Sequence, residues 1–297
     1  MLELIDLRRR IKSVKNTQQI TQAMKTVSSA KFRKAQRFVL EARPFWHSHP
    51  DFLLQALSWT DWTGHPLLKQ REEKRALLVV ISSDKGLCGA FNSNLLSRIH
   101  DFCLEKSRTC KIHLVLVGKK AVTFFRDKGF PAERIYKDQI HKLSDEELKD
   151  LSRFLVQQYA LCRTDSVYAA HNEFKSILAP RVTLLKVLPL TTAGQSEEAA
   201  KRDPAGIADG FPPDWEPSMK SQLHGLLPFY VENQIFHFFH ESAAAEHAAR
   251  MMAMDNATQN AEDLIEELTL VLNKIRQASI TKELLEIMTA VEALVKK

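Results

Sequence analysis

Apolar residues recur with helical spacing at both ends of the chain. Two stripes near the start advance in steps of three and four residues: Leu4, Leu7, Ile11 and Val14, then Ile20, Ala23, Val27 and Ala30. A third stripe, near the other end, consists of Leu264, Leu268, Val271, Ile275 and Ala278. Because side chains three and four positions apart share one face of a helix, these steps predict helices that pair as a coiled coil.

A further apolar stripe lies at the very end of the chain, out of phase with the stripe before it. Its members are Ile280, Leu284, Ile287, Val291 and Leu294. The two-residue offset after Ala278 turns the apolar face by about 200° around the helix axis. We therefore expect the last turns to meet a different partner from the turns that precede them.

Helix-breaking residues are confined to the middle of the chain. All 9 glycines and all 11 prolines lie between Pro44 and Pro228. Since glycine and proline punctuate helices, both ends are predicted to be long helices around a domain rich in turns. We assign residues 1–58 to the first helix, 75–190 to an α/β domain, 191–218 to a polar loop or insert, and 219–297 to the last helix.

The middle of the chain alternates strand and helix patterns. The predicted strands are Ala76–Ser82, Lys111–Val117, Val167–Asn172 and Arg181–Leu188, and the predicted helices are Asn92–Lys106 and Ser144–Cys162. The second helix opens with Ser144-x-x-Glu147, which is a capping box. Short aliphatic runs separated by helices indicate a small, mainly parallel, Rossmann-like sheet.

Charge is distributed unevenly between the two ends. The chain carries a net charge of +6, and residues 1–43 hold 11 basic side chains against 3 acidic ones. Residues 241–297 hold 6 basic side chains against 10 acidic ones. Opposite signs favour pairing of the two terminal helices with each other. They also leave positive charge on the first helix for a partner outside the chain.

One loop has the composition of a phosphate-binding or nucleophile loop. It reads SSDKGLCGAFN over residues 82–92, between a predicted strand and a predicted helix. Gly86-x-x-Gly89 lacks the lysine and hydroxyl of a P-loop and the three glycines of a dinucleotide-binding turn. A nucleotide-binding α/β enzyme that uses the Gly86 loop is therefore an alternative. The simpler interpretation is a tight turn, with Asn92 or Ser93 capping the helix that follows.

Other candidate chemistry is sparse. The four cysteines form no Cys-x-x-Cys pair, and His237, His240 and His247 form no His-Glu-x-x-His motif. We expect no cofactor, no metal, no catalytic activity and no membrane-spanning helix. A nucleic-acid binder that uses the basic first helix is a second alternative. It is disfavoured because only Phe32 and Phe38 could stack on bases there.

Four long segments resemble a known family along nearly the whole chain. They are LRRRIKSVKNTQQITQAMKTVSSAKFRKAQ (7–36), SSDKGLCGAFNSNL (82–95), AAEHAARMMAMDNATQNAEDLI (244–265) and NKIRQASITKELLEI (273–287). In order and in spacing they are similar to the gamma subunits of rotary, F-type ATP synthases. Because the resemblance starts within the first few residues, the basic start is interpreted as part of a shaft helix rather than as a transit peptide.

The resemblance implies a fold, a role and a set of partners. The terminal helices would form an antiparallel coiled coil inside a ring of three alpha and three beta subunits. The α/β domain would lie beside the epsilon subunit and the membrane ring of c-subunits. The chain would be a non-catalytic rotor shaft that couples ion transport to ATP synthesis or hydrolysis. It would be a peripheral protein on the cytoplasmic face of the cell membrane, and both proton and sodium coupling stay open.

The resemblance also implies contact residues on both terminal helices. On the opening helix they are Lys12, Lys15, Thr21, Met24 and Lys25, which would face acidic segments of beta. On the closing helix they are Arg276, Gln277, Thr281 and Glu283, which would touch the catch region of beta.

Overall fold

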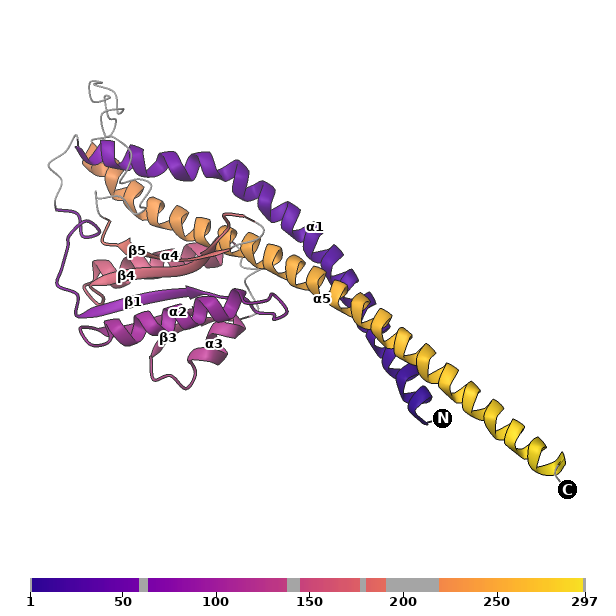
Figure 1. The fold of residues 1–297 in the computed structure, drawn as a ribbon. Coiled ribbons are helices and arrows are strands. Elements are labelled where there is room, and N and C mark those ends of the chain that lie inside the picture. Colours follow the sequence, from indigo (N-terminus) through magenta and orange to yellow (C-terminus); the bar gives the residue numbers. More distant parts are fainter. Residues whose placement is uncertain (1, 59–63, 138–144, 177–179, 191–218, 296–297) are drawn as a thin grey trace. The chain divides into compact units, whose positions relative to one another are not determined.

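The computed structural model describes residues 2–58, 64–137, 145–176, 180–190 and 219–295 (Figure 1). Two long helices begin and end the described chain, α1 (Leu2–Ser58) and α5 (Met219–Val295). The chain divides into two compact units, one made of Met1–Ser28 with Met251–Lys297 and the other of Ser29–Arg250. Glycine and proline do not end these helices, since Pro44 lies inside α1, and Gly225 and Pro228 lie inside α5.

The second unit contains a five-stranded sheet in the order β3-β2-β1-β4-β5. Its strands are β1 (Arg75–Ile81), β2 (Lys111–Val117), β3 (Ala132–Tyr136), β4 (Ser166–Glu173) and β5 (Arg181–Leu188). All neighbouring strands run parallel except β4 and β5. The predicted α/β class with a mainly parallel sheet is confirmed. The chain builds outward from β1 to β3 and then returns to the other side of β1, so β1 and β4 flank a topological switch point.

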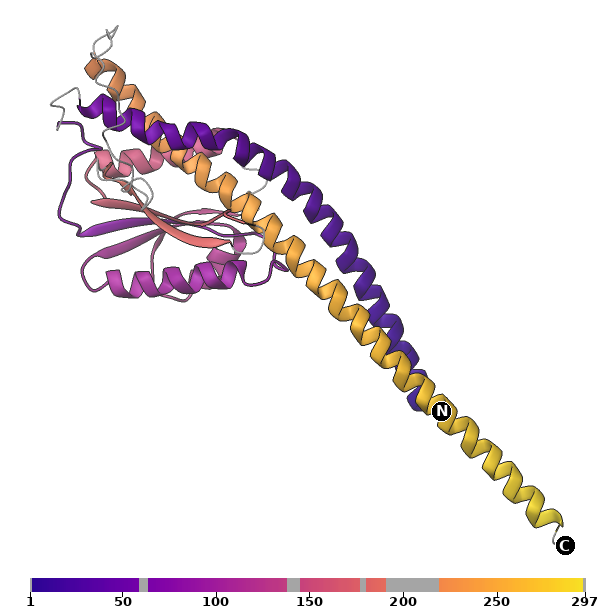
Figure 2. The same cartoon turned by 45° about the horizontal axis from the view of Figure 1, so that its top comes forward.

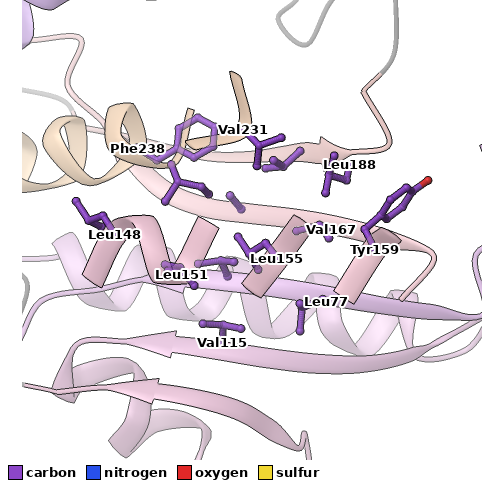
Figure 3. Packing of buried hydrophobic residues seen from close by; sticks show 14 of the residues in the cluster. Leu77, Val115, Leu148, Leu151, Leu155, Tyr159, Val167, Leu188, Val231 and Phe238 are labelled. Carbon is purple, nitrogen blue, oxygen red and sulfur yellow. The ribbon is translucent and has the colours of Figure 1, made fainter. Parts of the chain in front are cut away.

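Both faces of the sheet are buried, each in a hydrophobic layer of its own. Side chains of β1 alternate between the layers, with Leu77 and Val79 in one and Leu78 and Val80 in the other. The first layer packs under α4 (Asp145–Ala160) and the early part of α5 (Figure 3). The second layer packs under α2 (Phe91–Lys106) and α3 (Lys119–Phe125). Burial on both faces explains why the strand sequences are continuous aliphatic runs.

Two short elements, β3 and α3, were not predicted from the sequence. The strand β3 pairs only with β2 within the described sheet, and its residues Ala132–Tyr136 are largely exposed. An edge strand of this kind needs no aliphatic run, so its sequence carries no strand signal. The helix α3 has 7 residues, which is too short for a periodic pattern to stand out.

The expected cap of α2 is wrong. Ala90 occupies the cap position without a side-chain hydrogen bond. Asn92 Oδ1 instead accepts the backbone N–H of Ser83, and Ser93 Oγ donates to the carbonyl of Ala90. Asn92 therefore closes the preceding loop rather than the helix end. The capping serine proposed at Ser144 and the predicted insert at 191–218 lie outside the described residues.

In the first unit, α1 and α5 pair in antiparallel fashion. The hydroxyls of Thr21 and Thr258 lie 2.8 Å apart, and Lys25 Nζ lies 2.5 Å from Asp255 Oδ1. Residue numbers rise along α1 as they fall along α5, which confirms the predicted antiparallel helix pair. Figure 2 shows α5 continuing past the end of α1 in this unit.

The second predicted stripe of α1 is wrong. Ile20 and Val27 are 61% and 56% exposed, whereas Thr21 and Ser28 are buried. The heptad of the first stripe continues without a break through residues 18, 21, 25 and 28, all of them polar. Small hydroxyl side chains let two helices approach closely and bond across the contact, so the paired face is less hydrophobic than the face beside it.

The paired face of α5 also differs slightly from its predicted stripe. Leu268 is buried, and Leu264 and Ile275 are half-buried, as expected. Val271 and Ala278 are exposed, and their neighbours Leu272 and Ser279 are the less exposed residues. No described helix contains an apolar stretch long enough to span a membrane.

Candidate functional site

The loop singled out in the sequence joins β1 to α2 and is closed by its own side chains. Asn92 Nδ2 donates to Ser83 Oγ at 2.8 Å and to Cys88 Sγ at 3.1 Å. Leu87 and Gly89 have positive φ angles of 62° and 58°, which turn the chain sharply. The loop is a tight turn, as the simpler interpretation held.

The backbone of this loop accepts hydrogen bonds from an arginine side chain of α5. Arg250 Nη2 donates to the carbonyl oxygens of Lys85 and Gly86, each at 3.3 Å. The same nitrogen donates to Glu246 Oε1 at 2.7 Å, and both charged side chains are buried. A phosphate-binding loop must turn backbone N–H groups toward its ligand. This loop turns carbonyl oxygens toward a guanidinium, so the arrangement disfavours the nucleotide-binding alternative.

A second contact of α5 lies at the end of β4. Glu241 Oε2 accepts the backbone N–H of Phe174 at 2.8 Å, and Arg43 of α1 donates to the carbonyl of the same residue. Arg43 Nε and Nη2 each lie 3.4 Å from Glu241 Oε1, and His237 Nε2 lies 3.3 Å from it. We call these four residues, Arg43, Phe174, His237 and Glu241, the β4 latch.

These two contacts occupy the usual ligand position of the fold. In open α/β sheets, ligands bind at the carboxyl ends of the strands next to the switch point. Here the loop after β1 binds Arg250, and the residue after β4 binds Glu241. The last helix therefore fills with its own side chains the edge where an enzyme of this fold would hold a substrate.

Two titratable groups at the latch, Glu241 and His171, have pKa values below their ordinary ones. Burial alone would raise the pKa of Glu241, but His237, the Phe174 N–H and Arg43 outweigh it and lower that pKa. His171 is buried and stacks on Phe238, with ring centroids 4.5 Å apart. Burial lowers the pKa of His171 to about 3. The carboxylate stays charged and the imidazole neutral, which suits a structural junction and not a proton-transfer site.

The described part of the chain offers no cluster of metal ligands, and of its four free cysteines only Cys162 is exposed. No group of three or more His, Cys, Asp or Glu residues there could hold a metal ion. Cys88, Cys103 and Cys110 are buried, and burial raises the pKa of Cys103 to about 12. A thiol with so high a pKa is not a nucleophile at neutral pH.

The predicted contact residues of α1 fall into two groups. Lys12 and Lys15 are exposed and Met24 is half-buried. Thr21 is buried against Thr258, and Lys25 bonds Asp255, so both already have partners within the chain. A contact of any of these five residues with another subunit stays a prediction.

The predicted contact residues of α5 lie close together on its exposed last third. Arg276, Gln277, Thr281 and Glu283 are all exposed. Thr281 Oγ1 donates to the backbone carbonyl of Gln277 at 3.0 Å. The helix brings these four residues within two turns of one another.

The end of α5 continues as an unpaired helix. If the register of Thr21 with Thr258 and of Lys25 with Asp255 is extended, the first residue of α1 lies beside about residue 277 or 278 of α5. Beyond that point Leu284 and Ile287 are 57% and 60% exposed. Ile280, Met288 and Val291 are exposed as well. Neighbouring exposed apolar side chains of this kind mark an interaction surface.

Sequence reasoning missed both buried ion-pair contacts. The available signal was a set of charges inside the apolar, alanine-rich segment FHFFHESAAAEHAARM, residues 236–251. Glu246 and Arg250 are four positions apart there, which is the spacing of a helical ion pair. Their partners in the loop at Gly86 are distant in sequence, so the pattern alone could not identify the contact.

Comparison with known proteins gives one consistent result. A family model described as ATP synthase matches residues 3–294. The ATP synthase gamma chain of Pelotomaculum thermopropionicum is 42% identical over 294 residues, covering 99% of this chain and 100% of that one. The corresponding protein of Desulforamulus reducens is 39% identical, covering 97% and 98%.

Solved structures share the fold at low sequence identity. A chain in the Euglena gracilis mitochondrial ATP synthase structure described as OSCP/F1/c-ring has a TM-score of 0.65 at 19% identity, covering 98% of this chain and 94% of that one. A chain in the central stalk/c-ring structure from Tetrahymena thermophila has a TM-score of 0.60 at 23% identity, covering 80% and 99%.

Proposed function

The chain belongs to the family of ATP synthase gamma chains, and we propose that it is the central rotor shaft of a rotary ATP synthase. It would couple ion flow through a membrane ring to ATP synthesis or hydrolysis in a surrounding catalytic ring, and would catalyse nothing itself. One observation carries the proposal. The paired helices continue into a single exposed apolar helix, beyond the reach of any other described part of their own unit.

The mechanism follows from the asymmetry of such a shaft. A single shaft inside a ring of three alpha and three beta subunits touches each beta subunit differently. Each catalytic site therefore has a different conformation and a different affinity for nucleotide. Rotation exchanges these states among the sites. The coupling is a free energy transmitted between distant sites by a rigid element.

Contacts along the shaft suit this role. Lys12 and Lys15 are exposed on α1, next to the exposed Arg8, Arg9 and Arg10. A cluster of five cations favours acidic partner surfaces through long-range attraction. We propose that these cations face acidic segments of beta, with Thr21, Met24 and Lys25 further along the same helix. Arg276, Gln277, Thr281 and Glu283 would touch beta near the tip.

The remaining partners and the location in the cell follow from the same assembly. We propose that the α/β unit binds the epsilon subunit and the c-subunit ring. The chain would then be attached to the cytoplasmic face of the cell membrane through that ring and not through a helix of its own.

Co-expression with alpha and beta subunits of the same source tests the proposal. We expect a complex with subunit ratio 3:3:1 and ATPase activity. A variant with Leu284, Ile287 and Val291 replaced by serine should lower the yield of that complex or its activity. A matched variant with the exposed residues Lys282, Glu286 and Thr289 replaced by serine is the control, since it leaves the apolar stripe intact.

Other outcomes would contradict the proposal. ATP binding or hydrolysis by the purified chain alone would favour the enzyme alternative. A duplex-binding constant that falls steeply with salt concentration would favour the nucleic-acid alternative. Absence of any complex with alpha and beta would overturn the assignment as a shaft.

A further inference from the structure

The β4 latch joins three parts of the chain that are far apart in sequence. Phe174 directly follows β4, where its backbone N–H and carbonyl no longer have strand partners. Glu241 of α5 takes the N–H, and Arg43 of α1 takes the carbonyl. The Phe174 ring is buried and meets the edge of Phe32 of α1, with centroids 5.3 Å apart. The residue that directly follows β4 thus contacts both long helices.

The chemistry of the latch differs from that of the packing around it. Apolar contacts between the sheet and α5 are non-directional, so they tolerate small sliding movements. Glu241 is 2% exposed, and its hydrogen bonds are directional and charge-assisted. Removing one partner from such a buried pair leaves an uncompensated charge, which makes sliding costly. The latch therefore fixes the position of the helices on the sheet, where the apolar layer only holds them together.

The carboxylate of Glu241 is needed in its charged form. Burial opposes ionisation, but His237, the Phe174 N–H and Arg43 together stabilise the anion and lower the pKa of Glu241. Glu241 is thus the acidic partner of the latch, and Arg43 and His237 are the basic side chains that face it.

We propose that Glu241 and Arg43 are positioning residues that pass torque between the α/β unit and the two shaft helices without slip. This inference rests on the proposed function as a rotor shaft. It assigns to these residues a role that the apolar tip of α5 does not have, since the tip would contact the catalytic ring while the latch transmits force within the chain.

The test uses the whole enzyme in membrane vesicles. Glu241→Gln keeps the size of the side chain and an acceptor for the Phe174 N–H, but it removes the charge that holds Arg43. We expect the number of ions pumped per ATP hydrolysed to fall at least about twofold, while ATP hydrolysis continues, because a coupling free energy is lost. Glu232→Gln, a half-buried carboxylate nine positions earlier on α5, is the matched control and should keep the wild-type ratio.

A second, milder variant tests the same contact in case Glu241→Gln fails to fold or assemble. Arg43→Lys keeps the positive charge, but lysine cannot reach Glu241 and the Phe174 carbonyl together through two forked nitrogens. It should lower the same ratio by a smaller factor and speed hydrogen exchange of the Phe174 amide in the assembled enzyme. If Glu241→Gln does not assemble, Arg43→Lys decides the question.

The outcomes separate two kinds of failure. A wild-type pumping ratio in an assembled Glu241→Gln or Arg43→Lys enzyme would overturn the latch and leave the shaft proposal intact. So would equal losses of pumping and hydrolysis, which indicate a merely structural role. Failure of the wild-type chain to assemble with its partners would overturn the shaft proposal, and the latch with it.

Discussion

Lys25 and Asp255 meet across the helix pair, with Nζ 2.5 Å from Oδ1, although 230 residues separate them in the sequence. Their side chains are 35% and 44% exposed, so water and salt screen the attraction. One turn away, Thr21 bonds Thr258 in the drier part of the same contact. Together the two contacts define the register in which α1 and α5 pair.

Lys25 could act through its pair with Asp255 or through a contact with another subunit, and variants of the pair distinguish these two roles. Lys25→Met and Asp255→Asn should each lower the free energy of unfolding by less than about 1 kcal/mol, and the double variant should cost little more than either alone. If Lys25 acts only through Asp255, both single variants should alter ATPase activity of the assembled enzyme equally. Urea unfolding and steady-state turnover measure the two quantities. A strong effect of Lys25→Met with none of Asp255→Asn would instead place the partner of Lys25 on another subunit.

The exposed tip of α5 gives a second prediction. Gln277 and Thr281 are exposed and linked through the Thr281 hydroxyl, so their side chains contribute little to folding. Gln277→Ala or Thr281→Ala should weaken coupling or ATPase activity in the assembled complex without unfolding the isolated chain. Turnover and circular dichroism of the two variants provide the check. Wild-type turnover in both would refute their assignment as contact residues.

The sequence predicted the strands that are rich in aliphatic residues and end beside glycine or proline. The bounds of β2 and β5 were predicted without error, because strand-ending residues adjoin them: Gly118 follows β2, and Pro180 and Pro189 flank β5. The edge strand β3 was missed, since exposed residues leave no such run. Strands could therefore be recognised where aliphatic side chains are buried, and not from intrinsic strand propensity.

The errors in the helix pair have a different cause. The pattern of α1 favoured Ile20 and Val27 as paired residues, but the structure buries Thr21 and Ser28. Hydrophobicity alone ranks a hydroxyl below an isoleucine, and it ignores the close approach and hydrogen bonding that small polar residues allow. The contacts of Arg43 and Arg250 could not be predicted from the sequence either, because each joins segments more than a hundred residues apart.

Gly118 permits a close crossing at the turn between β2 and α3. Its φ angle is 91°, and a Cβ atom there would lie 2.4 Å from the carbonyl oxygen of Ser82. Gly118→Ala should lower the free energy of unfolding by about 2–5 kcal/mol, of which about 1–2 kcal/mol is backbone strain and the rest is overlap. Gly129→Ala is the control, because Gly129 also has a positive φ of 78° but no neighbour near its Cβ position. Equal losses in thermal or urea unfolding would show that overlap with Ser82 contributes nothing.

The contacts of the Glu73 carboxylate lead to a prediction of how the free energy of unfolding depends on pH. Its carboxylate is 19% exposed and binds Lys106 of α2, Lys186 of β5 and the hydroxyl of Tyr168 of β4. Burial alone would raise the pKa of Glu73, but the hydrogen bonds and charges of the two lysines outweigh it and lower the pKa from 4.5 to about 2. The folded state therefore binds this proton less tightly than the unfolded chain does. The contribution is complete above about pH 4.5 and is lost as the pH falls toward 2.

Glu73→Gln should remove this contribution. At neutral pH the variant should be less stable than the wild type by up to about 3 kcal/mol, and the difference should shrink steadily below pH 4.5. Urea unfolding between pH 3 and pH 7 measures it. Glu72→Gln is the matched control, since its neighbouring carboxylate is 80% exposed and pairs only with Lys74 among the described ion pairs. A difference between Glu73→Gln and wild type that stays constant across this range would show that the two lysines do not hold the charged carboxylate.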